Sequence, residues 1–379
     1  MKINVSIVNE ASAALDLLDQ YWAFAQYKSR HQDYKPDFEI VTHQGINIDP
    51  DSLNIGWFMM PTTDQDFDQF DLILLDNTHH SLEKCNEIMH RCLLDRDNCF
   101  LITGAYLTDD HIIKNKSIWL PLQGHVRNLL LRPCYPQFFE RELASNKSRH
   151  NMIFINGQAR ANRQYFLNLL LIALPEIPVK NTFPGLVKLE PSVFESDQDT
   201  EFRETVNKLV TANSDYDSIR KYYDNPVLMG ITGKFGQAMP GYMLIDDYVN
   251  YHCVIFPETQ WLNNQLFITE KSSKCFVGRS IPWPIGGANM IELYRTVGYQ
   301  TAYDLLPDEF RYDAIQDHAT RHQMCANAIA WAYSNPDIWI SDQAQQIIEN
   351  NYNNFFTNTY DAQGVKQLDS ILTKTICTL

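Results

Sequence analysis

The sequence predicts an α/β protein of two domains, each built around a parallel sheet. Three observations support this fold class. The chain has 379 residues, enough for two domains that each bury a core of their own. Its composition, with 45% hydrophobic and 20% charged residues, is typical of a globular protein. Short apolar runs alternate with stretches of helical spacing, the pattern of a parallel sheet with crossover helices.

The first half of the chain begins with this alternation. Apolar runs predict strands at residues 2–8, 38–41, 70–76 and 99–104, and helical spacing predicts helices at 10–30 and 82–94. The strand at 70–76 ends in Asp76, and Asn77, Thr78, His79 and His80 follow it. Ligands of parallel sheets gather at the carboxyl ends of the strands. Asp76, His79 and His80 are therefore the first candidate site residues of this half.

The second half follows a polar stretch near residues 141–150, which we interpret as a linker. The expected strands are residues 152–156, 251–256 and 281–285, and the expected helices are 160–174, 269–277, 288–297, 311–334 and 338–352. Residues 191–221 are interpreted as an acidic, polar insert. This organisation predicts a first domain at residues 1–147, a second at 148–342 and a C-terminal helical segment at 343–379.

Charge and cysteine usage narrow the class of protein. The net charge of −15 opposes passive binding to nucleic acid or to anionic lipid, so no nucleic-acid partner is expected. The eight cysteines form no C-x-x-C pair, which favours a reducing compartment, and we expect a cytoplasmic protein. Residues 1–8 are typical of a first strand rather than a signal peptide. No apolar run approaches the ~20 residues of a membrane helix.

One stretch, residues 267–276, combines several features of an anion site. Thr269 is a candidate N-cap for the helix that follows, and Glu270 in its first turn suits the positive end of the helix dipole. Lys271 lies beside the unpaired backbone N–H groups of the same turn, an arrangement that can hold a phosphate. An ordinary capped helix before a buried strand is the plainer interpretation of the same residues.

The stretch belongs to a longer pattern of an aromatic residue, x-Thr-Glu-Lys, a helix and then Pro-x-x-x-Gly. Its places are filled by Phe267, Thr269, Glu270, Lys271, Pro282 and Gly286. This pattern resembles the donor-binding motif of the α1,3-fucosyltransferases and of related bacterial and phage glycosyltransferase-like proteins. Residues 154–166 resemble the strand, turn and helix that begin the family's nucleotide-binding half. The resemblance covers residues 150–305 and leaves out the N-terminal third.

The resemblance implies a GT-B-type fold, in which two Rossmann-like domains face a cleft. In such transferases the last helix often crosses back to the first domain, a course open to residues 343–379. It also implies transfer of a sugar from a nucleotide-sugar, with a GDP-sugar such as GDP-fucose favoured, to a hydroxyl acceptor such as a glycan. The transfer would invert the anomeric centre and need neither a metal nor a further cofactor.

The resemblance also assigns roles to individual residues. Those expected to bind the donor are Arg160, Arg163, Glu258, Phe267, Thr269, Glu270 and Lys271. Arg163 and Lys271 would hold the departing diphosphate, because fixed cations stabilise the charge that grows on its oxygens. Glu270 would accept from ribose hydroxyls and Phe267 would stack on the base. Glu258 would face the sugar or pair with a lysine, and Thr259 departs from the asparagine often found after this acid.

An inverting transfer also needs a general base, which the resembled family takes from its first domain. By its place at a strand end, Asp76 is the first candidate and His79 the second. Asp109 and Asp110, in the loop after the strand at 99–104, are held in reserve. For each of these side chains a structural or solvated role is the plainer interpretation.

Other chemistries have weaker support. Six Asp-x-Asp pairs occur without one clearly closing a strand, so a metal-dependent transferase is disfavoured. His318 and His322 have zinc-compatible spacing but no evident third ligand, and we expect a surface helix face there. Two alternatives stay open: a catalytically silent nucleotide- or glycan-binding protein of the same fold, and a phage-type glycosyltransferase acting on DNA bases, which the negative charge disfavours.

Overall fold

A computed structural model of the chain describes most of the predicted strands and helices. The described residues are 2–9, 39–59, 66–77, 87–109, 111, 113–119, 149–156, 161–181, 200, 203, 204, 208, 245–258, 261, 263, 265–357, 367, 368, 370, 371, 374 and 375. The chain divides into two compact units, one of residues Met1–Asn128 with Thr359–Leu379 and one of Leu129–Asn358. The predicted helix at 10–30 and the polar insert at 191–221 lie almost wholly outside the described residues.

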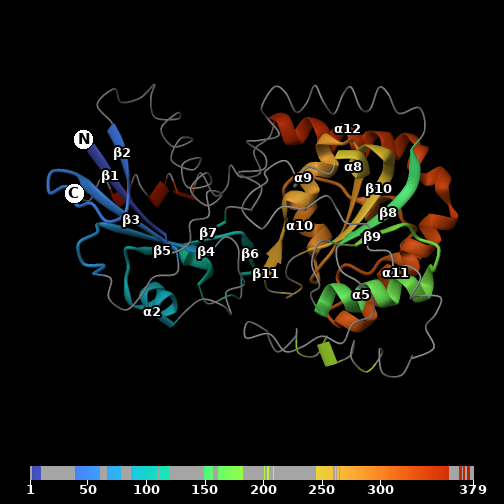
Figure 1. Ribbon diagram of the computed structural model, residues 1–379, viewed down its shortest axis with the longest axis horizontal. Coiled ribbons are helices and arrows are strands. Elements are labelled where there is room, and N and C mark those ends of the chain that lie inside the picture. Colours follow the sequence, from blue (N-terminus) through green and yellow to red (C-terminus); the bar gives the residue numbers. More distant parts are fainter. Residues whose placement is uncertain are drawn as a thin grey trace. The chain divides into compact units, whose positions relative to one another are not determined.

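The first unit contains a six-stranded parallel sheet with the strand order β2-β1-β3-β4-β5-β7 (Figure 1). Its strands are β1 (Lys2–Asn9), β2 (Glu39–Gln44), β3 (Leu53–Met59), β4 (Leu72–Asn77), β5 (Cys99–Thr103) and β7 (Ser117–Trp119). The short strand β6 (Ala105–Leu107), the helix α2 (Glu87–Asp95) and the 3-10 turn η2 (Lys114–Lys116) accompany them. The parallel sheet confirms the predicted α/β class for this half.

Hydrophobic side chains of several strands form the core of this unit. Ile3, Ile55 and Leu74 are fully buried in it. Leu368, close to the end of the chain, is fully buried in the same cluster. The C-terminal segment therefore contributes to the core of the first unit, the course that the sequence analysis left open for it.

The second unit contains a four-stranded parallel sheet with the order β12-β10-β8-β9. Its strands are β8 (His150–Asn156), β9 (Val179–Asn181), β10 (Tyr251–Pro257) and β12 (Ile281–Ile285), and a further short strand is β11 (Gln265–Phe267). The helices are α5 (Ala161–Ala173), α8 (Ile245–Asn250), α9 (Glu270–Val277), α10 (Met290–Thr296), α11 (His318–Ser334) and α12 (Asp342–Thr357). The 3-10 turns are η4 (Ala302–Leu305), η5 (Asp308–Phe310) and η6 (Pro336–Ile340).

Helices cover both faces of this second sheet. In Figure 1, α5 and α11 lie on one side of the sheet, and α8, α9 and α12 lie on the other. α5 packs against α11, and α9 packs against α12 and β12. A parallel sheet buried on both faces needs nearly continuous apolar strands, and the last five residues of β8 and all of β12 are buried. This layered arrangement is that of a doubly wound, Rossmann-like domain.

The prolines of β12 are compatible with its place at the edge of the sheet. Pro282 and Pro284 pair in register with Val254 and Phe256 of β10, and among the described strands β12 has no second neighbour. A proline has no backbone N–H to donate, so it is tolerated at an edge but not between two strands. The Pro-x-Pro sequence thus leaves the strand intact.

Two predicted helices differ from the observed ones for identifiable reasons. The helix predicted at 311–334 begins only at His318, because Asp317 caps it by accepting a 2.7 Å hydrogen bond from the backbone N of Thr320. The helix predicted at 338–352 is divided into η6 and α12, with Ser341 between them. The prediction also missed β3, a short apolar run interrupted by Gly56, a residue that weakens a strand pattern.

Some predictions on organisation stay open. The predicted domain boundary at residues 147 and 148 lies outside the described residues, so it stays a prediction. α12 belongs to the second unit, whereas residues 359–379 group with the first. That the two domains face a cleft also stays a prediction. Among the described helices, not one combines the length and the hydrophobicity needed to cross a bilayer.

Candidate functional site

The order of the strands in the second unit indicates where a ligand would bind. β8 leads through α5 to β9 on one side of it, and β10 leads through α9 to β12 on the other side. The chain therefore changes direction between β8 and β10. In open α/β sheets, ligands bind beyond the carboxyl ends of the strands at such a topological switch point. We call the end of this sheet where β8, β10 and β12 terminate the carboxyl edge.

Glu258, directly after β10, lies at the carboxyl edge and is fully buried. Its Oε1 accepts hydrogen bonds from the backbone N of Thr269 at 3.2 Å and from the hydroxyl of Tyr294 at 3.2 Å. Its Oε2 accepts from the Thr269 hydroxyl at 2.6 Å. A buried carboxylate is tolerated only when hydrogen bonds or cations compensate its lost hydration. These contacts hold the carboxylate in one orientation.

Lys271 supplies the positive charge beside this carboxylate. Its Nζ is 3.9 Å from Glu258 Oε2 and donates to the Thr269 hydroxyl oxygen at 3.1 Å. The side chain is 15% exposed, so a small part of it reaches solvent at the start of α9. Of the pairings considered from the sequence, the structure therefore shows the one between Glu258 and Lys271. It places the lysine in the first turn of a helix, where backbone N–H groups also attract an anion.

Thr269 is the N-cap residue of α9, as predicted, but its side chain does not cap the helix. Its backbone is extended, with φ −105° and ψ 176°, and its hydroxyl makes no hydrogen bond to a backbone N–H of the first turn. The hydroxyl donates to Glu258, and its oxygen accepts from Lys271 Nζ, so the side chain is directed to these two partners rather than to a backbone N–H of the helix. The expected capping contact is thus replaced by a contact within the site.

Tyr294 is a member of this site that the sequence analysis missed. It lies on α10, its ring is fully buried, and its hydroxyl is hydrogen-bonded to Ser272 of α9 as well as to Glu258. Burial raises the pKa of Tyr294 well above its usual range, and the negative charge of Glu258 raises it further. The phenol therefore stays protonated and acts as a donor. Its place on the buried side of an amphipathic helix was visible in the sequence, but its acid partner was not.

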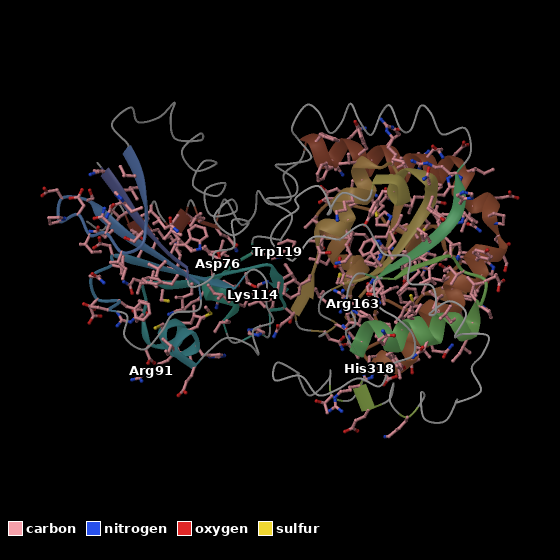
Figure 2. All side chains as sticks on the ribbon, in the orientation of Figure 1. Asp76, Arg91, Lys114, Trp119, Arg163 and His318 are labelled. Atoms are coloured by element: carbon pink, nitrogen blue, oxygen red, sulfur yellow. The ribbon has the colours of Figure 1, made fainter. Side chains whose placement is uncertain are left out.

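Arg163 lies in the first turn of α5, which begins at the carboxyl edge beyond β8 (Figure 2). Its side chain is only 3% exposed, and its backbone N donates to the side chain of Asn162 at 2.9 Å. An arginine this deeply buried is not the solvated surface residue that was the plainer interpretation of the sequence. α5 and α9 lie on opposite faces of the sheet and both begin at the carboxyl edge, so Arg163 and Lys271 flank the switch point.

The remaining predicted donor residues are less accessible or lie outside the described part of the chain. Phe267 ends β11 and is fully buried, as a core aromatic would be, so its stacking on a base stays a prediction. Glu270 is the first residue of α9, and the placement of its side chain is not described. Arg160 and Thr259 lie outside the described residues.

In the first unit, Asp76 is on β4, the strand next to β3, and is 4% exposed (Figure 2). The indole Nε1 of Trp57 donates to its Oδ2 at 2.9 Å. Asp76 is therefore a held, buried carboxylate near the end of a parallel strand. Asp109, a reserve candidate, is 98% exposed and 3.9 Å from Lys114, as a solvated loop acid would be. His79, His80 and Asp110 lie outside the described residues.

The expectation of a surface helix face at His318 and His322 is wrong for His322. This side chain is 1% exposed, and its ring centre is 4.3 Å from that of Trp261. Burial lowers the pKa of His322 well below its usual range, and the charge of Arg321 lowers it further. Within the described ranges, no three His, Cys, Asp or Glu side chains are grouped so that they could hold a metal ion. The metal-independent mechanism stays a prediction.

No family model matches the chain, and no curated protein matches it. Among solved structures, it is similar to an α1,3-fucosyltransferase with GDP-fucose, at 11% identity and a TM-score of 0.46, covering 98% of this chain and 90% of that one. It is also similar to an α,α-trehalose 6-phosphate synthase from Burkholderia multivorans, at 9% identity and a TM-score of 0.36, covering 95% of this chain and 75% of that one. A third similar structure is a UDP-GlcNAc 2-epimerase from Neisseria meningitidis bound to UDP-GlcNAc, at 8% identity and a TM-score of 0.37, covering 99% of this chain and 100% of that one. At this level of likeness, function must be inferred from the residues of the site.

Proposed function

We propose that this protein is an inverting glycosyltransferase that takes a sugar from a nucleotide-sugar and attaches it to a hydroxyl acceptor such as a glycan. A GDP-sugar, with GDP-fucose as the first candidate, is the favoured donor, and no metal is needed. The observation that supports this most directly is the arrangement of Glu258, Thr269 and Lys271 at the carboxyl edge, beside the switch point of the second unit. Thr269 and Lys271 belong to the motif that resembles the fucosyltransferase donor site, and Glu258 is the strand-ending acid before it.

The proposed chemistry follows from where charge develops. As the bond between the sugar and the diphosphate breaks, negative charge grows on the phosphate oxygens, and Arg163 and Lys271 would stabilise it. A lysine ammonium can donate three hydrogen bonds, so a phosphate oxygen can join the contacts that hold Lys271 in place. Glu258 keeps that ammonium at the start of α9, where the helix N–H groups add to the attraction.

The acceptor needs a base to remove its proton as it attacks the anomeric carbon. Asp76 is our first candidate and His79 the second. The hydrogen bond from Trp57 fixes the orientation of the Asp76 carboxylate, which is the proton acceptor in this proposal. The proton passes to that carboxylate, the sugar passes to the acceptor oxygen, and the nucleoside diphosphate leaves with the bonding electrons.

Calorimetric titration with GDP, UDP and GDP-fucose tests the donor site. We expect the intact protein to bind GDP and the Lys271→Met variant to bind it at least about tenfold more weakly, because a charge-assisted contact to phosphate contributes about 1.5–3 kcal/mol. Lys208→Met, at an exposed lysine, is the matched control and should bind like the unaltered protein. A protein that binds none of the three nucleotides would contradict the proposal.

The burial of Asp76 favours one alternative, a catalytically silent nucleotide-binding protein of the same fold. A carboxylate that is 4% exposed and bonded to a buried indole is also what a structural role would produce. Sugar release from GDP-fucose separates the two possibilities. Asp76→Asn should abolish turnover and leave GDP affinity unchanged if the protein is a transferase, whereas the silent protein shows no turnover before any substitution.

A further inference from the structure

A small cavity of about 10 Å³ lies at the carboxyl edge of the second unit, beyond the end of β12. It is lined by the end of that strand, the start of α10 and the first turns of α11. Its lining residues include Gly286, Gly287, Ile291, Asp313, Arg321 and His322. Gly286 is the last residue of the motif that resembles a donor site, but none of these residues was assigned a role in donor binding. What occupies the cavity is therefore a separate question.

Arg321 brings hydrogen-bond donors to this cavity. Its side chain is 1% exposed, and its Nη1 donates to the backbone oxygens of Ile315 at 2.6 Å and Gln316 at 3.2 Å. Its Nε and Nη2 have no hydrogen-bond partner among the residues that the structure describes. A buried donor without a partner destabilises the folded state, so native proteins almost always supply one. The cavity is where such a partner can be placed.

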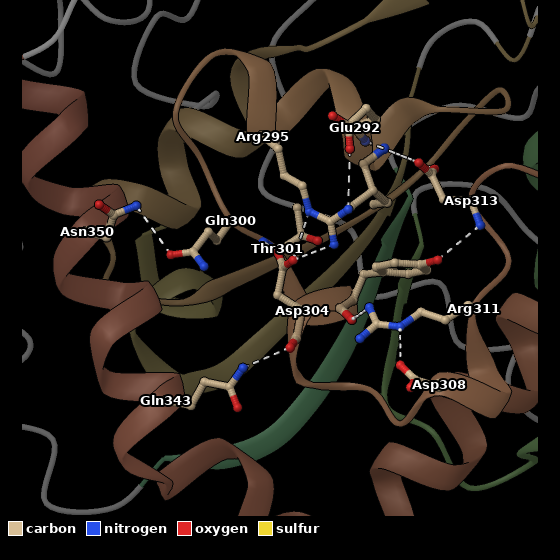
Figure 3. A network of polar contacts seen from close by, with 12 residues as sticks. Glu292, Arg295, Gln300, Thr301, Asp304, Asp308, Arg311, Asp313, Gln343 and Asn350 are labelled. Carbon is tan, nitrogen blue, oxygen red and sulfur yellow. Dashed lines mark hydrogen bonds and ion pairs between the residues drawn. The ribbon is translucent and has the colours of Figure 1, made fainter.

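Asp313 supplies the opposite charge in the same lining, and its carboxylate is already held. It is 7% exposed and accepts hydrogen bonds from the backbone N of Ile291 at 3.0 Å and of Glu292 at 3.1 Å, at the start of α10 (Figure 3). Burial lowers the pKa of Arg321, and the negative charge of Asp313 opposes this effect. The lining thus contains one negative and one positive side chain: a carboxylate that is already held by hydrogen bonds and a guanidinium with unmatched donors.

Size and charge together restrict what can occupy the cavity. Roughly 10–15 Å³ of space for a water-sized sphere holds one water molecule, so a phosphate or a carboxylate is too large. A small anion would be attracted by Arg321 but repelled by Asp313, and it would lose its hydration on entry. A cation would be repelled by the guanidinium of Arg321. An uncharged oxygen fits the volume of the cavity, accepts from the donors of Arg321 and adds no charge beside Asp313 and Arg321.

We propose that this cavity is a binding site for one uncharged oxygen, which accepts hydrogen bonds from Nε and Nη2 of Arg321. The oxygen is that of a buried water or that of a hydroxyl group on a ligand bound at the carboxyl edge. The hydroxyl source rests on the proposed function, since a nucleotide-sugar would supply it. The water source does not depend on that function.

Crystal structures of the full chain, one without nucleotide and one with GDP-fucose, provide the test. We expect density for one oxygen within about 3.2 Å of Nε or Nη2 of Arg321. A peak in the ligand-free crystal that persists in the complex identifies a water, and a peak replaced by a sugar hydroxyl identifies the ligand. The proposal is overturned if both nitrogens bond only to protein atoms, or if the peak shows the anomalous scattering of chloride.

Binding measurements add a second readout that distinguishes the two sources. If a sugar hydroxyl enters the cavity, Arg321→Met should weaken GDP-fucose binding about tenfold or more and leave GDP binding unchanged. If a water occupies it, both affinities should stay within about twofold of the unaltered protein. Arg311→Met, at an exposed arginine nearby, is the matched control. Equal weakening of GDP and GDP-fucose would contradict the proposal, because the cavity has no room for a phosphate.

Failure of this proposal and failure of the proposed function give different results. If the protein binds no nucleotide, the proposed glycosyltransferase function is wrong. The ligand-free crystal would still show whether Arg321 donates hydrogen bonds to a water. Conversely, the protein could bind GDP-fucose while Nε and Nη2 of Arg321 contact only protein atoms. That result would be consistent with the proposed function and would contradict the proposed cavity site. The ligand-free crystal also needs no variant, so it stays decisive if Arg321→Met does not fold.

Discussion

Glu258 is the side chain on which the polar contacts of the candidate site converge. Two hydroxyls, one backbone N–H and one ammonium approach its two oxygens, from the residues after β11, from α9 and from α10. Each of these donors offsets part of the cost of burying a carboxylate. Removing a donor should therefore cost more than removing a polar group of the same kind elsewhere in the protein.

Replacing Tyr294 with phenylalanine tests this statement. The change deletes the hydroxyl that donates to Glu258 and leaves a buried carboxylate with fewer partners, so we expect a loss of about 1–3 kcal/mol in the free energy of unfolding. Urea denaturation measures it. Tyr333→Phe, at a partly exposed tyrosine, is the control and should change stability by less than about 0.5 kcal/mol. Equal effects of the two substitutions would show that the contact with Glu258 is not worth more than a surface hydroxyl.

A second prediction concerns the acid side of the stability profile. The pKa of His322 lies well below its usual value of 6.5 in the folded protein because the ring is buried beside Arg321. The unfolded chain therefore takes up a proton below pH 6.5 that the folded protein does not, so stability is full above this pH and falls as the pH decreases. Between pH 7 and pH 5, the unfolded ring's usual pKa limits this loss to at most about 2 kcal/mol.

His322→Phe keeps an aromatic ring against Trp261 and removes the titrating group. We expect the stability of the variant to fall less than that of the unaltered protein between pH 7 and pH 5, by a difference of up to about 2 kcal/mol, whatever its stability at pH 7. Urea unfolding at a series of pH values measures the difference. If the two stability profiles run parallel, His322 is protonated in the folded protein and the burial argument is wrong.

The residues of the site were predictable to different degrees. Thr269 and Lys271 lie close together in the chain, and both were named from the sequence because their motif resembles a donor site. Glu258 comes eleven residues before Thr269. Its position at the end of a strand suggested that it belongs to the site, but the sequence did not decide which lysine it would pair with. Tyr294 is 36 residues from Glu258, and nothing local in the sequence links a helix tyrosine to a distant carboxylate. Contacts across such separations depend on the order of the strands.

At the scale of elements, apolar runs predicted most strands well because strands buried on both faces need continuous hydrophobic sequence. Helix starts were less predictable, because they depend on side-chain caps such as that of Asp317 for α11. The pairing of β8 with both β9 and β10 was beyond prediction, since a sequence does not state strand order. That pairing creates the switch point, and so the location of the candidate site within its domain required the structure.

The end of α9 supplies a prediction for an element. Gly278 closes this helix against α8, and a Cβ at this position would lie 2.6 Å from the backbone oxygen of Tyr248. Backbone cannot move aside as a flexible side chain can, so Gly278→Ala should cost about 1–3 kcal/mol. Thermal and urea denaturation measure the loss.

The control for this prediction is a glycine with open surroundings. Gly45 has a φ of +85°, and a Cβ added to it would meet no atom within 4 Å. Asparagine tolerates such a backbone, so Gly45→Asn should cost less than Gly278→Ala. If Gly278→Ala is neutral, α8 and α9 do not approach each other as closely as this structure shows.

At the scale of the whole molecule, the chain forms two units with separate cores, and its C-terminal segment returns to the first. Leu368 is fully buried in the core formed by β1, β3 and β4, although most of the chain lies between them. The second core contains Leu170 of α5, which is fully buried as well. The length and composition of the chain predicted two cores. Which of the two units the C-terminal segment packs into depends on tertiary contacts.

Leu368→Ala and Leu170→Ala together test this division. Each removes a buried leucine side chain and should cost about 2–5 kcal/mol, through lost burial and the cavity that remains. Because the cores are separate, Leu368→Ala should speed hydrogen exchange in peptides from β3 and β4 and leave β12 protected, and Leu170→Ala should do the reverse. Hydrogen exchange measured by mass spectrometry gives both patterns in one experiment on the full chain. If either variant speeds exchange in β3 and β12 equally, the two units unfold together. If Leu368→Ala is that variant, the C-terminal segment stabilises the whole molecule rather than the first unit alone.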